Sequence, residues 1–419
     1  MNDVRAHDVV IVGAGAAGLA TAIFLRRANP TRSVRLLDGA RAPGAKILVS
    51  GGSRCNVTNR VVSERDFWGG RRPIVRRILR GFTADDTVRF FREHGVTLHE
   101  EADGKLFPDS GRARDVLTAL IRGVNAAGAE LCSDHRVFDI ERTAEGFQLE
   151  TERGTLRCRY VVLATGGQSL PKTGSDGTGF RFAIKLGHTI VPTTPALAPL
   201  MLDQTSEAAF NRALTGVSHE AALTVWVDGR VGVRLRGSLL WTHVGISGPL
   251  ALNASRHWLR AEAEGRPARV TLSFCPDATF ETQEELWTEM AVARSKTSVA
   301  TALAGLVPGS VASALVERLK IDPTRQLAQL TRTERRLLVS ALVESPIPVM
   351  GCRGYNFAEA TAGGVALEEV DPSTMASRRC AGLYLVGEML DVDGRIGGFN
   401  FQWAWSTAYL AGRALGTQP

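Results

Sequence analysis

The chain has 419 residues, 44% of them hydrophobic, so it can bury a large core and is long enough for two or three domains. Its six cysteines form no C-x-x-C pair and no Cys/His ligand spacing, which argues against a metal site, a disulfide framework and a dithiol centre. This usage indicates a reducing, cytoplasmic setting. The net charge of +7 comes almost entirely from arginine, which favours composition bias over a nucleic-acid surface.

The most apolar run covers residues 9–25. It contains several glycines and follows Asp8 rather than a cationic segment, which argues against a signal peptide or a membrane anchor. The run instead predicts a buried parallel strand over residues 8–12 and a helix over residues 19–28.

A complete G-x-G-x-x-G lies between this strand and this helix. Gly13 would allow the tight turn, Gly15 would let backbone amides approach a pyrophosphate, and Gly18 would let the helix pack on the strand. A second predicted strand, residues 33–37, ends at Asp38, the distance at which a carboxylate accepts hydrogen bonds from an adenosine ribose. We therefore predict a dinucleotide site with these contacts: Gly13, Ala14, Gly15, Ala16, Gly18, Asp38 and Gly39.

A long loop, residues 39–59, follows instead of another strand and helix. A loop of this length is expected to have a function. Gly51 and Gly52 can bring backbone amides to an anion, and Lys46 and Arg54 add positive charge. This arrangement favours FAD, which must be held along its whole length, over NAD.

The loop carries a motif that resembles a known family. Gly44-x-Lys46-x-x-x-Ser50-Gly51-Gly52-x-Arg54-Cys55-Asn56-x-Thr58-Asn59 is similar to the signature of the BaiN/RdsA-like bacterial NAD(P)/FAD-dependent oxidoreductases, which include aminoacetone-oxidase-like flavoproteins. Ser53 replaces the glycine usual in that pattern, which affects only local backbone geometry. Further segments of the family pattern recur along the chain at residues 242–249, 361–365, 387–394 and 397–400.

Together with the strand and helix patterns further along the chain, the resemblance implies an α/β fold: a discontinuous, glutathione-reductase-like FAD-binding Rossmann domain with an inserted β-barrel-like domain and a small helical subdomain. It also implies a second flavin contact at Ala164, Thr165 and Gly166, after a strand that ends near residue 163, and an adenine contact at Val137. The glycine-rich residues 174–179 follow no strand and have the wrong spacing for a second fingerprint. NAD(P)H would therefore dock transiently as an electron donor, without a domain of its own.

Composition changes at residues 192–199, which read as a linker into the insert. Strands are predicted over residues 221–227, 231–241 and 268–274, with Asp228-Gly229 as a hairpin turn, and helices over residues 282–304, 310–319 and 331–343. The expected boundaries are residues 1–193 and 345–419 for the FAD-binding domain, 194–280 for the β-rich insert and 281–344 for the helical subdomain.

The chain returns to the nucleotide fold with a predicted strand over residues 383–388 and a final helix to residue 415. In the family, an acid after this strand meets the ribityl chain or the pyrophosphate, a role that Glu388, Asp391 and Asp393 share as candidates. Amides at the start of the last helix would face the flavin pyrimidine. The remaining cofactor candidates are Lys46, Gly51, Gly52, Ser53, Arg54, Cys55, Asn56, Gly387, Gly397, Gly398, Phe399 and Asn400.

These features predict an FAD-dependent oxidoreductase that acts on a small organic substrate, with NAD(P)H-driven reduction through flavin N5. Oxygen-dependent amine oxidation is an alternative, and a flavin-containing tRNA-binding or tRNA-modifying protein is a second, suggested by the arginine-rich residues 71–80. His243 is the candidate for proton transfer, although a histidine that stabilises a turn explains it equally. Cys55 is interpreted as a packed residue at the cofactor rather than a redox centre. No metal or membrane partner is expected, a nucleic-acid partner is disfavoured, and the oligomeric state stays open.

Overall fold

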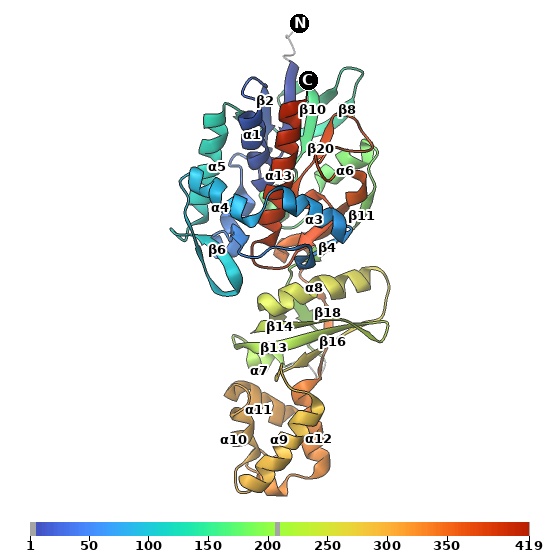
Figure 1. The fold of residues 1–419 in the computed structure, drawn as a ribbon. Helices are drawn as coiled ribbons and strands as arrows, with labels where there is room; N and C mark the ends of the chain where they lie inside the picture. The colour runs from blue at the N-terminus through green and yellow to red at the C-terminus, as the bar shows by residue number, and fades with distance from the viewer. Residues whose placement is uncertain (1–5, 206–209, 419) are drawn as a thin grey trace. The chain divides into compact units, whose positions relative to one another are not determined.

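The computed structural model describes residues 6–205 and 210–418. The chain divides into two compact units, residues 1–193 with 358–419 and residues 194–357 (Figure 1). Residues 345–357, which the sequence pattern placed in the FAD-binding domain, therefore fall in the second unit. The reason is that strands β17 (Ser345–Ile347) and β18 (Val349–Cys352) hydrogen-bond into the sheet of that unit.

The main sheet of the first unit has the strand order β7-β2-β1-β10-β9-β8. The first part of β10 pairs with β9, and its last three residues pair with β20. Strands β7, β2, β1, β10 and β20 are parallel, as predicted for an interior βαβ arrangement. Their bounds are β1 Ala6–Val12, β2 Val34–Leu37, β7 Glu130–Cys132, β8 Val137–Arg142, β9 Phe147–Thr151, β10 Gly154–Leu163 and β20 Leu383–Leu385.

Helix α1 (Ala16–Ala28) packs along the C-terminal helix α13 (Phe399–Thr417), so the two ends of the chain share one core (Figure 1). Gly412 permits this close packing, because a Cβ there would lie 2.7 Å from the Cβ of Phe24. The other helices of this unit are α2 Ala45–Ser53, α3 Arg72–Gly81, α4 Ala84–Glu93, α5 Ala113–Ala127 and α6 Thr178–Lys185.

Three small sheets complete the first unit and tie distant segments together. They pair β21 (Val392–Gly394) with β4 (Phe67–Gly69), β11 (Ile190–Ala196) with β19 (Ala360–Val365), and β3 (Thr58–Asn59) with β6 (Lys105–Pro108) and β5 (Leu98–Glu100). Residues 39–59, predicted to be a loop, therefore contain both a short helix, α2, and a strand, β3.

The second unit is built on one antiparallel sheet with the order β17-β16-β13-β14-β15-β12-β18. The insert is β-rich, as predicted. Residues 6–205 and 210–418 contain no pairing between the edge strands β17 and β18, so the sheet of this barrel-like insert stays open at its edges. The predicted hairpin is confirmed, since Val227 pairs with Arg230 around Asp228 and Gly229, both with positive φ. The strands not yet given are β12 Leu200–Leu202, β13 Ser218–Val227, β14 Arg230–Thr242, β15 Gly245–Ser247 and β16 Ala268–Ser273.

Helices cover this sheet and extend beyond it. Helix α8 (Gly248–Ala263), which the sequence pattern did not predict, packs on strands β13, β14 and β16. The single helix predicted over residues 282–304 is two helices, because Ser298 caps a new one with its side chain. The remaining helices are α7 Asn211–Leu214, α9 Phe280–Ala293, α10 Val299–Ala304, α11 Gly309–Arg318 and α12 Arg332–Val343. In the described part of the chain, none of the helices has both the length and the apolar character needed to span a membrane.

Candidate dinucleotide-binding site

The carboxyl ends of the parallel strands in the first unit define the candidate site. Strands β1, β2, β10 and β20 run in the same direction and lead into Gly13, Asp38, Ala164 and Val386. Ligands of parallel α/β sheets bind at this edge of the sheet. The structure therefore brings four separate predicted contact segments to one edge.

The three fingerprint glycines have different reasons to be glycine. Gly13 has φ +103°, and a Cβ there would lie 2.5 Å from the carbonyl oxygen of Ala164. A Cβ at Gly18 would lie 1.8 Å from the carbonyl oxygen of Gly13. A Cβ at Gly15 would meet no protein atom within 4 Å. Gly13 and Gly18 thus serve packing, whereas Gly15 leaves space beside the start of α1.

The start of α1 has the properties of an anion site. Its N-cap, Gly15, provides no side-chain hydrogen bond, and its first turn contains no acidic residue. The free N–H groups of this turn and the helix dipole favour a negative charge here. The end of α1 that faces the site therefore fits a diphosphate.

Asp38 holds the glycine loop in place. Its Oδ2 accepts a hydrogen bond from Ala14 N at 2.7 Å, and its Oδ1 accepts one from Ala40 N at 2.8 Å. Burial raises the pKa of Asp38, and these amide hydrogen bonds oppose the rise. The carboxylate keeps free lone pairs for a ribose. The next residue, Gly39, lies against Arg136, the neighbour of Val137, since a Cβ at Gly39 would lie 3.2 Å from the Cβ of Arg136.

Helix α2 is regular only at its start. Ser50 is extended, and Gly51, Gly52 and Ser53 have φ of 54°, 67° and 67°. A Cβ at Gly52 would meet no protein atom within 4 Å, so the backbone here is open to a ligand. A run of residues with positive φ turns successive amides toward one side, as an anion-binding loop requires.

Ser53→Gly is expected to increase the free energy of unfolding by up to about 1 kcal/mol, because a left-handed conformation is strained for any residue with a Cβ. Ser53 is exposed, so the serine side chain has no core contact to lose. Urea unfolding of the two proteins measures the change. Ser53→Ala keeps the Cβ and should show no gain; an equal gain for both would disprove the role of backbone strain.

A cluster of polar side chains joins the α2 segment to the C-terminal part of the unit. The ammonium of Lys46 pairs with Glu388 and donates to Ser169 Oγ. Glu388 Oε1 also accepts from Ser169 Oγ at 2.7 Å and from Thr361 N at 2.9 Å. Ser169 and Thr361 were not among the predicted contacts, because their positions in the sequence lie far from both charged residues.

The other charged residue of this segment, Arg54, is also engaged within the chain. Its guanidinium pairs with Glu101 Oε1 at 2.6 Å and lies 4.1 Å from the ring centroid of Phe107. The positive charges of Lys46 and Arg54 are thus both balanced by carboxylates. Cys55 is fully buried, and burial raises the pKa of its thiol to about 12. It stays protonated at neutral pH, which agrees with a packed residue and not with a reactive thiolate.

The start of α13 contacts residues 56–59, which follow α2 in the chain. Its N-cap, Gly398, has φ +90°, and a Cβ there would lie 2.5 Å from Thr58 O and 2.8 Å from Asn56 Oδ1. Asn59 Nδ2 donates to Gly397 O at 3.1 Å. This helix, like α1, has no capping side chain and no acid in its first turn, so its amides are free.

The neighbouring C-terminal candidates are held by the fold. Gly387 N donates to Thr407 Oγ1 at 3.0 Å, and Asn400 exchanges hydrogen bonds with both backbone groups of Gly394. Phe399 and Asp393 are buried, and Asp391 is half-buried, with its carbonyl accepting from Gly70 N at 2.7 Å. These residues shape the wall of the site.

Several buried polar atoms along this edge have no partner in the described residues. They are Asn56 Oδ1, Thr165 Oγ1 and Ser175 Oγ. An unpaired buried polar atom is costly unless a ligand or water completes it. Together with the two uncapped helix ends and the open glycines, they fit a long dinucleotide with phosphate, ribityl and ring polar groups, which is FAD.

His243 lies outside this set. It is exposed in the turn between β14 and β15 of the second unit, and its candidate role in proton transfer rests on the family pattern at residues 242–249. Gly245 N donates to Thr242 Oγ1 at 3.1 Å, a hydrogen bond that stabilises this turn.

The fold and the site define a flavoprotein with an FAD-binding Rossmann domain. The family model described as "HI0933-like protein Rossmann domain" matches residues 7–414. The chain belongs to this family, as its resemblance to the BaiN/RdsA-like flavoproteins implied, and it is an FAD-dependent oxidoreductase.

Relatives match over nearly the whole chain. A ribosomal RNA dihydrouridine synthase of Escherichia coli (strain K12) is 33% identical over 97% of this chain and 98% of its own length. A 3-dehydro-bile acid delta(4,6)-reductase of Clostridium scindens is 31% identical over 99% of this chain and 100% of its own length. A quinol-fumarate reductase with menaquinol molecules, at 16% identity and a TM-score of 0.50, covers 98% of this chain and 70% of its own, which shows a shared fold.

Proposed function

We propose that this protein reduces a carbon–carbon double bond conjugated to a carbonyl, with electrons that pass from NAD(P)H through FAD. The observation that carries the proposal is the dinucleotide site at the strand ends of the first unit. Gly174 to Gly179 follow no strand and lead only into α6, so they offer no second site of this kind. The names of two relatives support the choice of reaction, since dihydrouridine is uridine reduced at one ring double bond and the other relative is a delta(4,6)-reductase.

The reaction adds a hydride to one carbon of the double bond and a proton to the other. FAD, when bound, supplies the hydride chemistry. The chain supplies the environment: the free amides at the start of α13 favour negative charge on a bound group, and the amides of α1 favour a diphosphate. The ion pair of Lys46 and Glu388 holds α2 against the residues that follow β20, so the two sides of the site keep a fixed position relative to each other.

A reoxidation experiment tests this reaction. FAD-loaded protein is photoreduced without oxygen and mixed with 2-cyclohexenone or, as the matched control, with cyclohexanone. We expect the flavin absorbance to return with the conjugated ketone only. Return with neither ketone, together with peroxide formation from an amine and oxygen, would instead support amine oxidation, the alternative that the sequence left open.

His243→Ala is expected to slow turnover by about 100-fold or more if His243 moves the proton, because general acid catalysis contributes effects of this size. The FAD content of the purified protein should not change, since His243 lies outside the dinucleotide site. Parallel loss of turnover and FAD would assign His243 a structural role.

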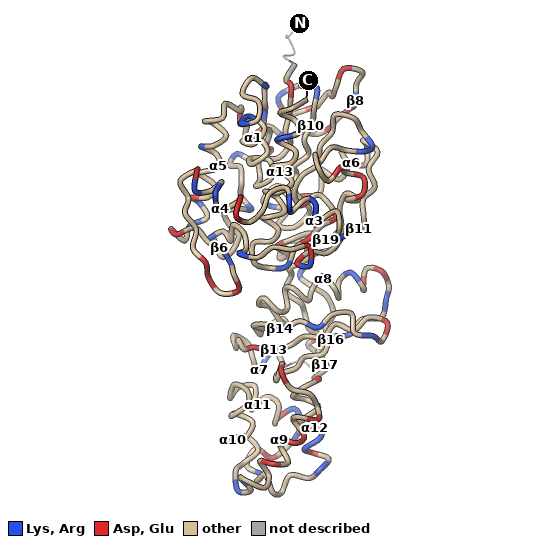
Figure 2. The backbone as a smooth tube through the Cα atoms, viewed as in Figure 1, with Lys and Arg blue, Asp and Glu red and all other residues tan. Residues whose placement is uncertain are grey.

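A second candidate function is the same reduction on a uracil ring in RNA. Its specific support is α3, whose exposed face carries Arg72, Arg76, Arg77 and Arg80 above a buried apolar stripe, with Arg71 at its N-cap (Figure 2). Arg76 pairs with Glu64, and among the residues that the structure describes Arg77 and Arg80 have no ion-pair partner. Arginines one turn apart repel each other, so an anionic partner would stabilise this face. The sequence alone disfavoured nucleic acid; two relatives named ribosomal RNA dihydrouridine synthase support it.

R77E/R80E is expected to weaken binding of transcribed ribosomal RNA by about 10-fold or more. The slope of log K against log salt concentration should fall by about one to two units, since roughly one unit is lost with each phosphate contact. The matched control is R332E/R336E on α12, which makes the same charge change on two exposed arginines of another helix. Retention in a gel shift at several salt concentrations measures both. Equal losses would indicate an effect of net charge, and no retention at low salt would end the RNA candidate while leaving enone reduction intact.

A further inference from the structure

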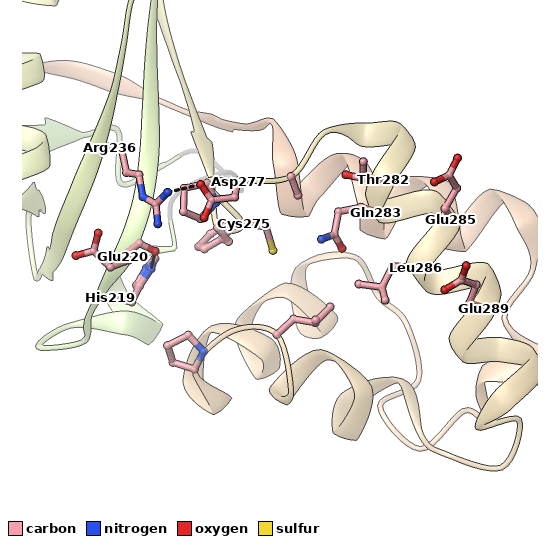
Figure 3. A pocket seen from close by; sticks show the side chains of 15 residues that line it. His219, Glu220, Arg236, Cys275, Asp277, Thr282, Gln283, Glu285, Leu286 and Glu289 are labelled. Carbon is pink, nitrogen blue, oxygen red and sulfur yellow. Dashed lines mark hydrogen bonds and ion pairs between the residues drawn. The ribbon is translucent and has the colours of Figure 1, made fainter.

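A cavity of about 840 Å³ opens in the second unit, and none of its lining residues is assigned to the flavin (Figure 3). It lies between the end of strand β16 and helix α9, and all of its lining residues belong to residues 194–357. A cavity of this volume is within the range of small-molecule sites. The proposed reaction uses none of these residues.

The inner wall of the cavity is apolar and aromatic. Phe274 is buried, and its ring stacks on His219 with the centroids 5.6 Å apart and the planes 22° apart. Both nitrogens of His219 are engaged: Nε2 accepts from Trp241 Nε1 at 3.0 Å, and Nδ1 lies 2.9 Å from Glu220 O. Burial also lowers the pKa of His219, so this wall adds no positive charge.

One polar atom points into this space without a partner. Gln283 is 6% exposed, and its Oε1 has no hydrogen-bond partner among the described residues. Figure 3 shows its amide directed into the space between Cys275 and Leu286. A buried amide oxygen accepts hydrogen bonds, so the missing partner is a donor.

The rim of the cavity carries an excess of negative charge. Arg236, the only basic residue among those that line the cavity in the described chain, pairs with Asp277. Glu220, Glu285 and Glu289 also line the cavity, are exposed, and have no ion pair within residues 6–205 and 210–418. An aromatic floor, an unpaired acceptor and three uncompensated carboxylates together favour a cation.

We propose that this cavity binds a small organic cation, an ammonium or guanidinium group on an apolar stem. The cationic group would donate to Gln283 Oε1, with Glu285 and Glu289 as the balancing charge, and the stem would pack against Phe274 and Leu286. This site is independent of the proposed reaction, because it holds no residue of the dinucleotide site.

Benzylamine is the probe, and benzyl alcohol is its neutral counterpart of the same shape. Each is titrated into the full-length, FAD-loaded protein, and binding is followed by calorimetry. Protection of Cys275, which lines the cavity, from alkylation is followed by peptide mass spectrometry. We expect benzylamine to bind at least about 10-fold more tightly than the alcohol, to protect Cys275, and to weaken as salt is raised.

The variants assign the effect to residues. Gln283→Leu and E285Q/E289Q should each weaken benzylamine binding by about 5-fold or more, one by removing the acceptor and the other the charge. Glu281→Gln removes one carboxylate charge from α9 outside the cavity and is the control for a general effect of charge on this helix. Equal binding of amine and alcohol, or no protection of Cys275, would overturn the proposal. Gln283 would then be satisfied within the chain, for which the unpaired Nε1 of Trp287, one turn away, is the donor.

Discussion

Gly15→Ala is expected to weaken FAD binding by about 100-fold or more while the protein remains folded. A Cβ at Gly15 meets no protein atom within 4 Å, and φ there is −80°, so alanine fits the chain itself. The added methyl group would occupy the space through which a diphosphate approaches the amides of α1. A loss of this size corresponds to about 2.7 kcal/mol. Quenching of FAD fluorescence on titration of the apoprotein gives the affinity, and urea unfolding gives the stability.

Gly18→Ala provides the contrast at a glycine of the same fingerprint. Its Cβ would lie 1.8 Å from Gly13 O, so the strand and helix must separate to accommodate it. We expect this variant to lose stability and FAD together. Wild-type affinity in Gly15→Ala would contradict the placement of the diphosphate at the start of α1.

Glu388→Gln is the second change with a large expected effect, a loss of about 2–3 kcal/mol in the free energy of unfolding. The side chains of Lys46 and Glu388 are 25% and 18% exposed, so their ion pair is mostly shielded from water. Removal of the carboxylate charge leaves the half-buried Lys46 ammonium without its ion-pair partner, which costs more than the pair itself contributes. Urea unfolding of the apoprotein measures the loss without any contribution from cofactor binding.

Two comparisons isolate the pair. The double variant K46M/E388Q should be less destabilised than the sum of its single changes, because it removes both charges. Glu101→Gln breaks the more exposed pair with Arg54 and should cost less than about 1 kcal/mol. Additive single losses would show that Lys46 and Glu388 do not act together.

The local parts of the fold could be predicted from sequence. Strand β1, the glycine turn, α1 and strand β2 follow from a buried β-branched run, three glycines and an apolar helix that are contiguous in the chain. Asp38 could be placed for the same reason, because a fixed spacing brings the end of β2 to the start of α1. The hairpin at Asp228-Gly229 could also be predicted, because this dipeptide is typical of a two-residue β-turn.

Contacts that depend on packing across the chain could not be predicted. Ser169 and Thr361 meet Lys46 and Glu388 only because β10, β19 and β20 bring their ends together. The open sheet of the second unit depends on β17 and β18 pairing with distant strands, which moved residues 345–357 out of the FAD-binding unit. Helix α8 was missed because its small and polar residues give weak helical periodicity.

The kink in α2 shows the limit of motif reading. The sequence predicted one long loop over residues 39–59, but residues 45–49 form a regular turn of helix before the positive φ values begin. The regular part of α2, which begins after the N-cap Gly44, is too short to show a helical pattern of hydrophobic residues in the sequence.

The most direct test of the account is an anaerobic titration of the FAD-loaded protein with NADPH and then with NADH, with the visible flavin band as the signal. Dithionite provides the control that the bound flavin is reducible. The account predicts rapid bleaching by at least one of the two nicotinamides, since the proposed reduction draws its electrons from NAD(P)H. Bleaching by dithionite but by neither nicotinamide would contradict the proposed electron donor and direct attention to an oxidase that is reduced by its own substrate.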